Sequence, residues 1–255
     1  MITTVLSRPL RKLRKHLRHV RARLLPLTNK RNSEFKYWKR RRAEKGHLDN
    51  AFYEWVYTTH FDLTPNFYAE KRVLDIGCGP RGSLEWAHMA RERVGVDPLA
   101  KRYRKLGTDV HAMRYVQAGA ESIPLPDQHF DVVAAFNSLD HVEDASQAIA
   151  EIKRVTKQGG LVEVNHPPTN TEPLTLRWNI VDEFRDCFEL IEQWSYEVGD
   201  HNLYRQLRRR VLYDHSESSD RPALLTAKFR KLAHATAALE PRRHQAGANR
   251  SVGDR

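Results

Sequence analysis

The segment Val73-Leu74-Asp75-Ile76-Gly77-Cys78-Gly79-Pro80 is the most informative part of this chain. It is an apolar run typical of a buried strand, and it ends in two glycines separated by one residue. Because glycine has no Cβ, such a loop lets a ligand approach the backbone closely. In an open α/β sheet, ligands sit beyond the carboxyl ends of the strands. We therefore predict a nucleotide-type α/β domain whose binding site includes this loop.

The chain after residue 71 alternates short β-branched runs with helical patterns. The run 131–136 is almost uniformly apolar, which indicates a strand buried on both faces, as in a parallel sheet covered by helices. Two longer runs near residues 187–198 and 202–211 flank Gly199-Asp200 and predict an antiparallel hairpin. Strands are expected at 72–76, 93–97, 114–118, 130–136 and 160–165, and helices at 50–69, 82–90, 99–106, 145–157 and 177–186.

The positive charge of the chain is confined to its two ends. The net charge is +11, but residues 1–45 carry 16 Lys/Arg against 2 Asp/Glu, and residues 221–255 carry 8 against 2. Residues 46–220 carry 19 against 28, so the body is acidic. A basic chain suggests nucleic acid as a partner, but this segregation weakens that inference for the core. We expect a basic amphipathic helical extension at 1–46, a cofactor-binding domain at 47–215, and a basic segment at 216–255 that is disordered at its end.

The extension includes a basic amphipathic helix at residues 5–25, with an apolar stripe at Leu6, Leu10, Leu13, Leu17, Val20 and Leu24. Three roles remain open for the basic extension. It could dock on the acidic body of its own chain and cover the active site as a lid, or simply be solvated. It could make peripheral contact with an anionic membrane through residues 5–25. It could bind nucleic acid or a protein partner, a role we favour less.

Composition excludes several classes of protein. No run approaches the roughly 18–20 apolar residues of a membrane span, and the first residues do not resemble a secretory signal. The two cysteines, Cys78 and Cys187, are far apart and lack metal-type spacing. This usage suits a reducing compartment and argues against a disulfide scaffold or a metal site. We expect a cytoplasmic protein, with membrane association left open.

Two cofactor classes compete for the glycine loop. Gly77, Gly79 and Gly82 have the G-x-G-x-x-G spacing that also occurs in dinucleotide-binding proteins. Asp97, about twenty residues further on, can accept both ribose hydroxyls of an adenosine in either class. Asp75 separates the two, because a carboxylate before the first glycine suits a cofactor with an ammonium and a sulfonium and would repel a pyrophosphate.

Two further blocks, residues 119–133 and 151–160, complete an ordered set of motifs. The set closely resembles class I S-adenosylmethionine-dependent methyltransferases, in particular the type 11-like group that acts on small molecules and lipids, over residues 70–165. The chain departs from the family at Gln158, where Pro is usual. The resemblance implies a doubly wound, mostly parallel seven-stranded sheet with an antiparallel C-terminal hairpin strand, and S-adenosylmethionine as cofactor.

The resemblance also implies roles for individual residues. Asp75, Gly77 and Gly79 would hold the methionine part of the cofactor, with Cys78 as a small filler beside it. Asp97 would take the ribose. Ala120 and Glu121 would lie by the adenine, and the segment from Asn137 to His141 would line the space between cofactor and acceptor.

Methyl transfer from a sulfonium is an in-line displacement in which positioning can supply most of the rate effect. A general base adds about 10²–10⁴-fold where the acceptor is a hydroxyl or similar group. His141, beside Asp140, is the candidate base, and His166 is the second choice. A purely structural role for His141, packing or capping the next helix, stays open.

The sequence therefore predicts an S-adenosylmethionine-dependent methyltransferase with a small-molecule, lipid or glycan acceptor. One alternative is an NAD(P)-binding oxidoreductase or epimerase, against which Asp75 and the lack of a Tyr-x-x-x-Lys motif argue. Another is a catalytically silent cofactor-binding adaptor. The identity of the acceptor is not specified by these motifs.

Overall fold

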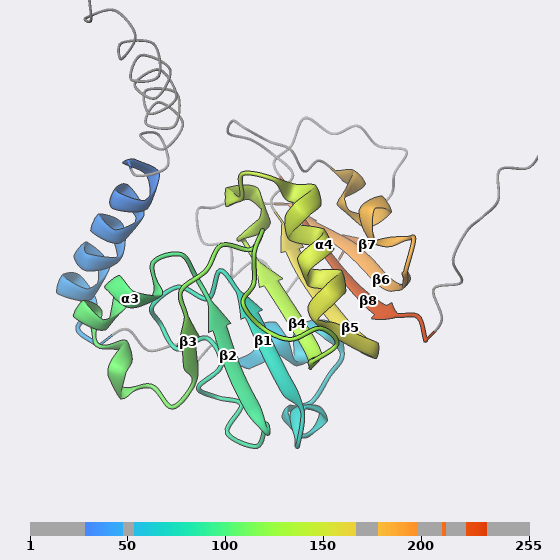
Figure 1. The fold of residues 1–255 in the computed structure, drawn as a ribbon, viewed down its shortest axis with the longest axis horizontal. Coiled ribbons are helices and arrows are strands. Elements are labelled where there is room, and N and C mark those ends of the chain that lie inside the picture. Colours follow the sequence, from blue (N-terminus) through green and yellow to red (C-terminus); the bar gives the residue numbers. More distant parts are fainter. Residues whose placement is uncertain (1–28, 48–53, 167–177, 198–210, 213–222, 234–255) are drawn as a thin grey trace, which may run out of the picture.

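The computed structural model describes residues 29–47, 54–166, 178–197, 211–212 and 223–233. Its centre is one mixed sheet with the strand order β3-β2-β1-β4-β5-β8-β6-β7 (Figure 1). The strands are β1 Arg72–Ile76, β2 Glu92–Val96, β3 Arg114–Val116, β4 Phe130–Phe136, β5 Thr156–His166, β6 Phe188–Glu197, β7 Val211–Leu212 and β8 Ala223–Lys231.

The first five strands form the parallel part of the sheet. β1 lies between β2 and β4 and pairs with both in parallel, β2 continues to β3, and β4 continues to β5. This arrangement confirms the predicted doubly wound, mostly parallel sheet. It also brings the carboxyl ends of β1, β2, β3 and β4 to one edge, where a ligand site is expected.

The remaining strands are antiparallel, as expected for the C-terminal part. β8 lies between β5 and β6 and pairs antiparallel with each, and the two-residue β7 pairs with β6. The sheet therefore has eight strands, one more than expected, because no strand was expected at the position of β8. β8 also extends the sheet beyond residue 215, where we expected the domain to end. Successive side chains of β8 point to opposite faces of the sheet, and Leu225, Ala227 and Phe229 are buried on one of them. This burial holds β8 in the sheet. Most of the second expected hairpin run, 202–211, lies outside the described residues.

The two faces of the sheet are covered by different elements (Figure 1). One face packs against α4 (Ala145–Val155) and the 3₁₀ segment η7 (Trp178–Phe184), with Ile149, Ile152 and Phe184 in the shared core. The other face is covered by residues 54–68 and by the turns around Leu84 and Trp86. Asp144 caps α4, accepting from the backbone N–H of Gln147 at 3.0 Å. Such a bond from a residue at the third helical position to an N-cap carboxylate is one half of a capping box.

The prediction of helices was wrong at two places. The expected helix at 82–90 is a series of turns, with i to i+3 hydrogen bonds such as that from the Glu85 N–H to the Gly82 carbonyl. The expected helix at 50–69 is broken, because Asp62 adopts a left-handed φ of 54° and Pro65 starts a new turn. It consists of α2 Glu54–Tyr57, η2 Thr59–Phe61 and η3 Pro65–Tyr68.

Three other expected elements shift only at their ends. The expected helix at 145–157 ends at Val155, because β5 already begins at Thr156, which pairs with Phe130. The expected helix at 99–106 is α3 Ala100–Tyr103 followed by η4 Arg104–Leu106, and the expected helix at 177–186 is η7.

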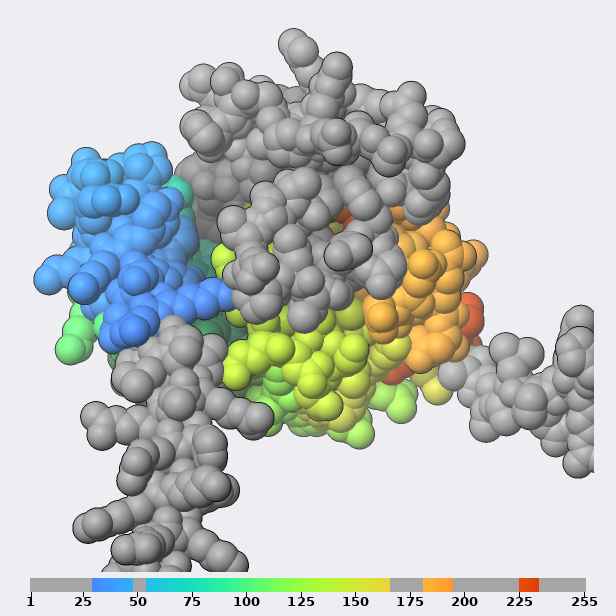
Figure 2. Space-filling view, turned by 90° about the horizontal axis from the view of Figure 1, so that it is seen from above, coloured from blue at the N-terminus to red at the C-terminus, as the bar shows by residue number. Residues whose placement is uncertain are grey.

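The chain is helical over residues 29–45, here called the N-terminal helix. It stands beside α3 at the β3 end of the sheet (Figures 1 and 2). Phe35 and Trp38 pack against the buried side chains of Leu99, Tyr103 and Leu106. The amphipathic helix expected at 5–25 and the tail from about residue 241 lie outside the described residues. Of the helices that the structure describes, none has the length and apolarity to cross a membrane.

Candidate functional site

The loop after β1 turns sharply at its glycines. Gly77 has a φ of 76° and donates its N–H to the Val96 carbonyl at 2.8 Å. A Cβ built on Gly77 would lie 2.3 Å from the Cβ of Ser138, so the loop and the segment after β4 approach at a distance that only glycine permits. The predicted close-approach loop is therefore present and packs against the end of β4.

Asp97 stands at the end of β2 beside this loop and is only 4% exposed. Its Oδ2 accepts the Gly79 N–H at 3.1 Å, and its Oδ1 accepts the Leu99 N–H at 2.7 Å. Burial raises the pKa of Asp97 to about 7, although these backbone N–H groups favour the charged form, and the nearby Glu34 raises it further. The carboxylate is thus oriented by the backbone and held next to the loop.

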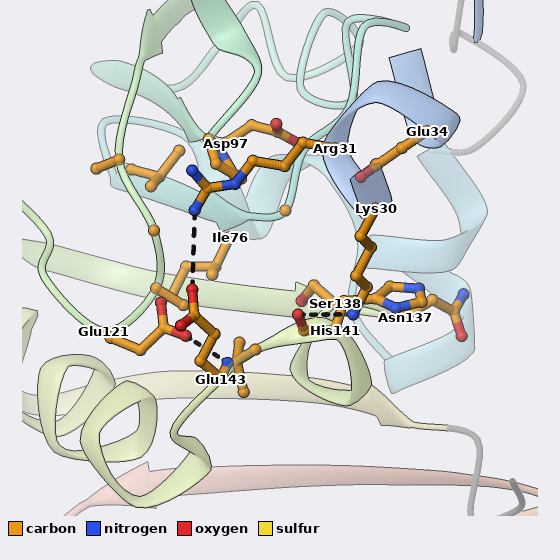
Figure 3. Close-up of a pocket in the computed structure, with 17 residues that line it drawn as sticks. Lys30, Arg31, Glu34, Ile76, Asp97, Glu121, Asn137, Ser138, His141 and Glu143 are labelled. Carbon is orange, nitrogen blue, oxygen red and sulfur yellow. Dashed lines mark hydrogen bonds and ion pairs between the residues drawn. The ribbon is translucent and has the colours of Figure 1, made fainter. Parts of the chain in front are cut away.

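A pocket opens at the carboxyl edge of the parallel strands (Figure 3). Its apolar wall is formed by β1, by β2 and by the segments that follow β2, β3 and η6 (Leu139–His141). Its polar groups come from the same three segments, from residues at η6 and from the N-terminal helix. The lining consists of Lys30, Arg31, Glu34, Ile76, Gly77, Val96, Asp97, Pro98, Ala118, Gly119, Ala120, Glu121, Asn137, Ser138, His141, Val142 and Glu143.

The structure brings most of the residues predicted from sequence to this pocket. Gly77, Asp97, Asn137 and His141 line it together with the pair Ala120-Glu121. Glu121 accepts the backbone N–H of Glu143 at 2.7 Å, which ties the segment after β3 to the segment after β4.

The other three predicted residues lie within or beneath the loop and do not appear in the lining. Asp75 is 3% exposed, accepts the Tyr57 hydroxyl at 3.2 Å, and has a pKa raised by burial to about 7. Cys78 is packed so closely beneath β2 that a Cβ on Gly95 would lie 2.5 Å from its Sγ. Burial raises the pKa of the Cys78 thiol well above its ordinary value, which suits a neutral filler. Gly79 faces the Trp38 ring of the N-terminal helix.

His141 lies at the outer end of the pocket. Its side chain is 60% exposed, and its Nε2 is 3.6 Å from Asp140 Oδ2. The backbone N–H of His141 donates to the Ser138 carbonyl at 3.0 Å and closes a tight turn. The pairing with Asp140 that the sequence suggested is therefore present. His166 is the last residue of β5, and its side chain lies outside the described residues.

Five polar residues of the pocket were not predicted individually: Lys30, Arg31, Glu34, Ser138 and Glu143. The first three lie on the N-terminal helix, and only the charge difference between the extension and the body pointed to them. That difference suggested a lid docked on the acidic core, and residues 29–45 make contacts of that kind. The sequence could not specify which side chains of the helix reach the pocket.

The residues fit a cofactor that joins an adenosine to a sulfonium amino acid. The lining contains apolar side chains suited to a base, namely Ile76, Val96 and Val142, and a carboxylate at Asp97 suited to ribose hydroxyls. Ser138 Oγ is buried and has no hydrogen-bond partner among the described residues, so it is available to a polar group of a ligand.

Comparison with known proteins gives the same interpretation. The methyltransferase domain family matches residues 74–164. The uncharacterized methyltransferase YcgJ of Bacillus subtilis is 35% identical over 158 residues, which cover 51% of this chain and 62% of that protein. The malonyl-(acyl-carrier protein) O-methyltransferase of Enterobacter lignolyticus is 32% identical over 114 residues, 44% of this chain and 45% of that protein.

A ubiquinone/menaquinone biosynthesis C-methyltransferase of Shewanella piezotolerans is 37% identical over 100 residues, 35% of this chain and 39% of that protein. The chain thus spans between 39% and 62% of the length of these three relatives. The matches decide between the two cofactor classes that the glycine spacing left open. Residues 74–164 thus form a methyltransferase domain, and the matches favour S-adenosylmethionine over a dinucleotide as its cofactor.

Proposed function

We propose that this chain transfers the methyl group of S-adenosylmethionine to a small-molecule, lipid or glycan acceptor. The observation that carries the proposal is the convergence of Gly77, Asp97 and Glu121 on one pocket at the carboxyl edge of the parallel strands. When bound, the cofactor supplies a methyl group on a positively charged sulfur, from which a nucleophile can take it in line.

The residues of the chain have separate tasks in this proposal. Asp97, fixed by two backbone N–H groups, accepts the ribose hydroxyls. Gly77 allows the cofactor to lie against the loop, and Ala120-Glu121 borders the base. Asp75, Cys78 and Gly79 shape the loop from beneath, and Asn137 lines the side that faces the acceptor. The result is fixed positioning of two reactants, the effect on which methyl transfer most depends.

His141 is the proposed general base for an acceptor that must lose a proton. It lies at the pocket, and its Nε2 is 3.6 Å from Asp140 Oδ2, which can orient the ring. We expect His141→Ala to reduce kcat by about 10²-fold or more with a hydroxyl acceptor. His129→Ala is the matched control, because His129 pairs with Glu92 at the opposite edge of the sheet. Full turnover of His141→Ala on its own acceptor would refute the role.

The central experiment is transfer of label from methyl-labelled S-adenosylmethionine into separated small-molecule, lipid and glycan fractions of a cell extract. The wild-type chain is expected to label one fraction, and Asp97→Ala is expected to label none. Cofactor binding without label in any fraction would contradict transfer and support the silent adaptor. The relatives named for malonyl-(acyl-carrier protein) and quinone acceptors support testing acidic thioesters and lipid-soluble rings first.

We further infer peripheral contact with an anionic membrane through the basic extension, residues 5–25 included. Lys36, Lys39 and Arg40 are exposed on the N-terminal helix, and Tyr37 between them is 43% exposed. Basic residues near an anionic surface contribute roughly 1 kcal/mol each. Flotation of the full chain with anionic but not with neutral liposomes is expected. Equal behaviour with both liposomes would contradict the contact.

A further inference from the structure

The pocket lining within the methyltransferase domain provides no Lys or Arg for the carboxylate of the cofactor. S-adenosylmethionine carries a carboxylate in addition to its sulfonium and ammonium groups. Within residues 74–164 the pocket lining contains the carboxylates of Asp97, Glu121 and Glu143 and no Lys or Arg. A ligand carboxylate among these acids would be repelled unless a cation lay next to it.

The N-terminal helix supplies the two Lys/Arg side chains of the lining, Lys30 and Arg31. Arg31 extends toward Glu143, with 4.0 Å between its Nη2 and Glu143 Oε1. Lys30 reaches toward the opposite part of the pocket, near Asn137, and its Nζ donates to the His141 carbonyl at 3.0 Å (Figure 3). Among the ion pairs between described residues none involves Lys30, so its charge is available to a ligand.

The position of Lys30 is fixed by contacts further along the same helix. Arg102 of α3 donates to Asn32 Oδ1 at 2.8 Å, and its guanidinium lies 4.2 Å from the centre of the Phe35 ring. The Phe35 and Tyr103 rings are stacked with centroids 6.5 Å apart. These contacts hold the first described turns of the helix against α3, so Lys30 is placed at the pocket before any ligand arrives.

Lys30 also lies at the appropriate part of the pocket. The adenosine half of the cofactor belongs with Asp97 and Ala120-Glu121, whereas the amino-acid half belongs with the loop at Gly77. Gly77 packs directly on Ser138, at the start of the segment that Lys30 contacts at His141. The carboxylate of the cofactor therefore comes to the same side of the pocket as the Lys30 ammonium.

We propose that Lys30 binds the carboxylate of S-adenosylmethionine, so that the N-terminal helix completes a cofactor site in which the domain at 74–164 lacks a cation. This inference rests on the proposed function, because it requires that the cofactor occupies this pocket. It gives a residue outside the matched domain a direct role in binding.

The test compares two ligands that differ only in that carboxylate, S-adenosylmethionine and decarboxylated S-adenosylmethionine, by calorimetry on the full chain. Lys30→Met is expected to lower the affinity for S-adenosylmethionine by about tenfold or more, the usual effect of losing a hydrogen bond between charged groups. The same variant is expected to leave the affinity for the decarboxylated ligand unchanged.

Two variants serve as controls. Lys39→Met removes an exposed cation of the same helix that does not line the pocket, and is expected to bind both ligands as the wild type does. As a positive control, Asn32→Ala removes the contact with Arg102 that helps to hold Lys30 at the pocket, so it is expected to weaken the binding of S-adenosylmethionine more than that of the decarboxylated ligand.

The outcomes are distinct. Unchanged S-adenosylmethionine affinity in Lys30→Met, or an equal loss for both ligands, would overturn the role of Lys30 and leave the proposed function intact. A wild-type chain that binds neither ligand would overturn the proposed function itself.

Discussion

Two buried carboxylates in this molecule, Asp97 and Glu163, have similar burial and different surroundings. Asp97 is 4% exposed and its pKa is raised by burial to about 7, while Glu163 is fully buried on β5 and its pKa is raised by burial to about 8. Asp97 accepts two backbone N–H groups and a hydrogen bond from the Tyr103 side chain at the edge of the pocket. Glu163 accepts the Tyr68 hydroxyl, at 3.0 Å to one oxygen and 3.2 Å to the other, and lies opposite Lys228 of β8.

The comparison shows that a raised pKa does not by itself identify a ligand site. Glu163 and its neighbours anchor the segment 54–68 on the sheet, since the Tyr68 hydroxyl also lies within hydrogen-bond distance of the Tyr57 carbonyl and Lys228 donates to the Phe61 carbonyl at 2.6 Å. Its partners are supplied by the fold, so it stabilises the protein. Asp97 lines the pocket, so it remains available to a ligand.

The largest expected effect is on stability. Glu163→Leu removes the carboxyl group that Tyr68 contacts and leaves the buried Lys228 with less compensation, so the free energy of unfolding is expected to fall by about 3–5 kcal/mol in urea denaturation. Glu163→Gln keeps an acceptor oxygen for Tyr68 and should lose much less. A loss below about 1 kcal/mol for Glu163→Leu would mean that this cluster does not hold the segment 54–68 in place.

Asp97→Ala is expected to affect cofactor binding more than it affects stability. We expect the affinity for S-adenosylmethionine to fall about hundredfold in calorimetry, because two hydrogen bonds to a charged group are lost. Asp131→Asn is the control, since Asp131 accepts the Arg72 N–H at the opposite edge of the sheet. If Asp97→Ala binds as tightly as the wild type, Asp97 does not belong to the cofactor site.

Gly77→Ala tests the contact between the loop and the segment after β4. The added Cβ would lie 2.3 Å from Ser138 Cβ at a φ of 76°, so we expect a loss of about 1–3 kcal/mol in stability and weaker cofactor binding. The double variant Gly77→Ala/Ser138→Gly should recover part of both, because it removes the clash but not the backbone strain. Thermal unfolding with and without cofactor measures the recovery. If Gly77→Ala has the stability and the cofactor affinity of the wild type, the loop and the segment after β4 can separate freely.

The stability of the protein is also expected to depend on pH. The pKa values of Asp75, Asp97 and Glu163 are raised in the folded state, so folding retains protons that the unfolded chain releases. Stability should therefore fall as the pH rises from about 5 to about 8.5. Glu163→Gln should flatten the upper part of this fall, because it removes the group with the highest of the three pKa values. Unfolding midpoints measured across that range test the sign, and a rise in stability would contradict it.

Cofactor affinity should change in the opposite direction over the same range. Ribose hydroxyls donate to the charged form of Asp97, so binding is expected to strengthen as the pH rises through about 7. A calorimetric titration at pH 6 and pH 8 checks this, and equal affinities would mean that Asp97 is already ionised in the free protein.

The sequence alone determined the elements whose information is local. The β1 strand and its loop follow from an apolar run and glycines within residues 73–80, and the backbone of Gly77 adopts the conformation that its residue type permits. The start of α4 follows from Asp144, and the limits of β4 coincide with those expected from its apolar run. Such features depend on neighbours within a few residues, so residue type and spacing are sufficient to predict them.

Only the tertiary structure decided which distant groups meet. β8 lies between β5 and β6, Tyr68 contacts Glu163 across 95 positions of sequence, and Lys30 reaches the carbonyl of His141 across 111. Net charge predicted that the basic extension could dock on the acidic body, but charge acts at long range and does not select a partner. Phe35 and Trp38 pack on Leu99, Tyr103 and Leu106. This contact holds the N-terminal helix in the position in which Lys30 lies at the pocket.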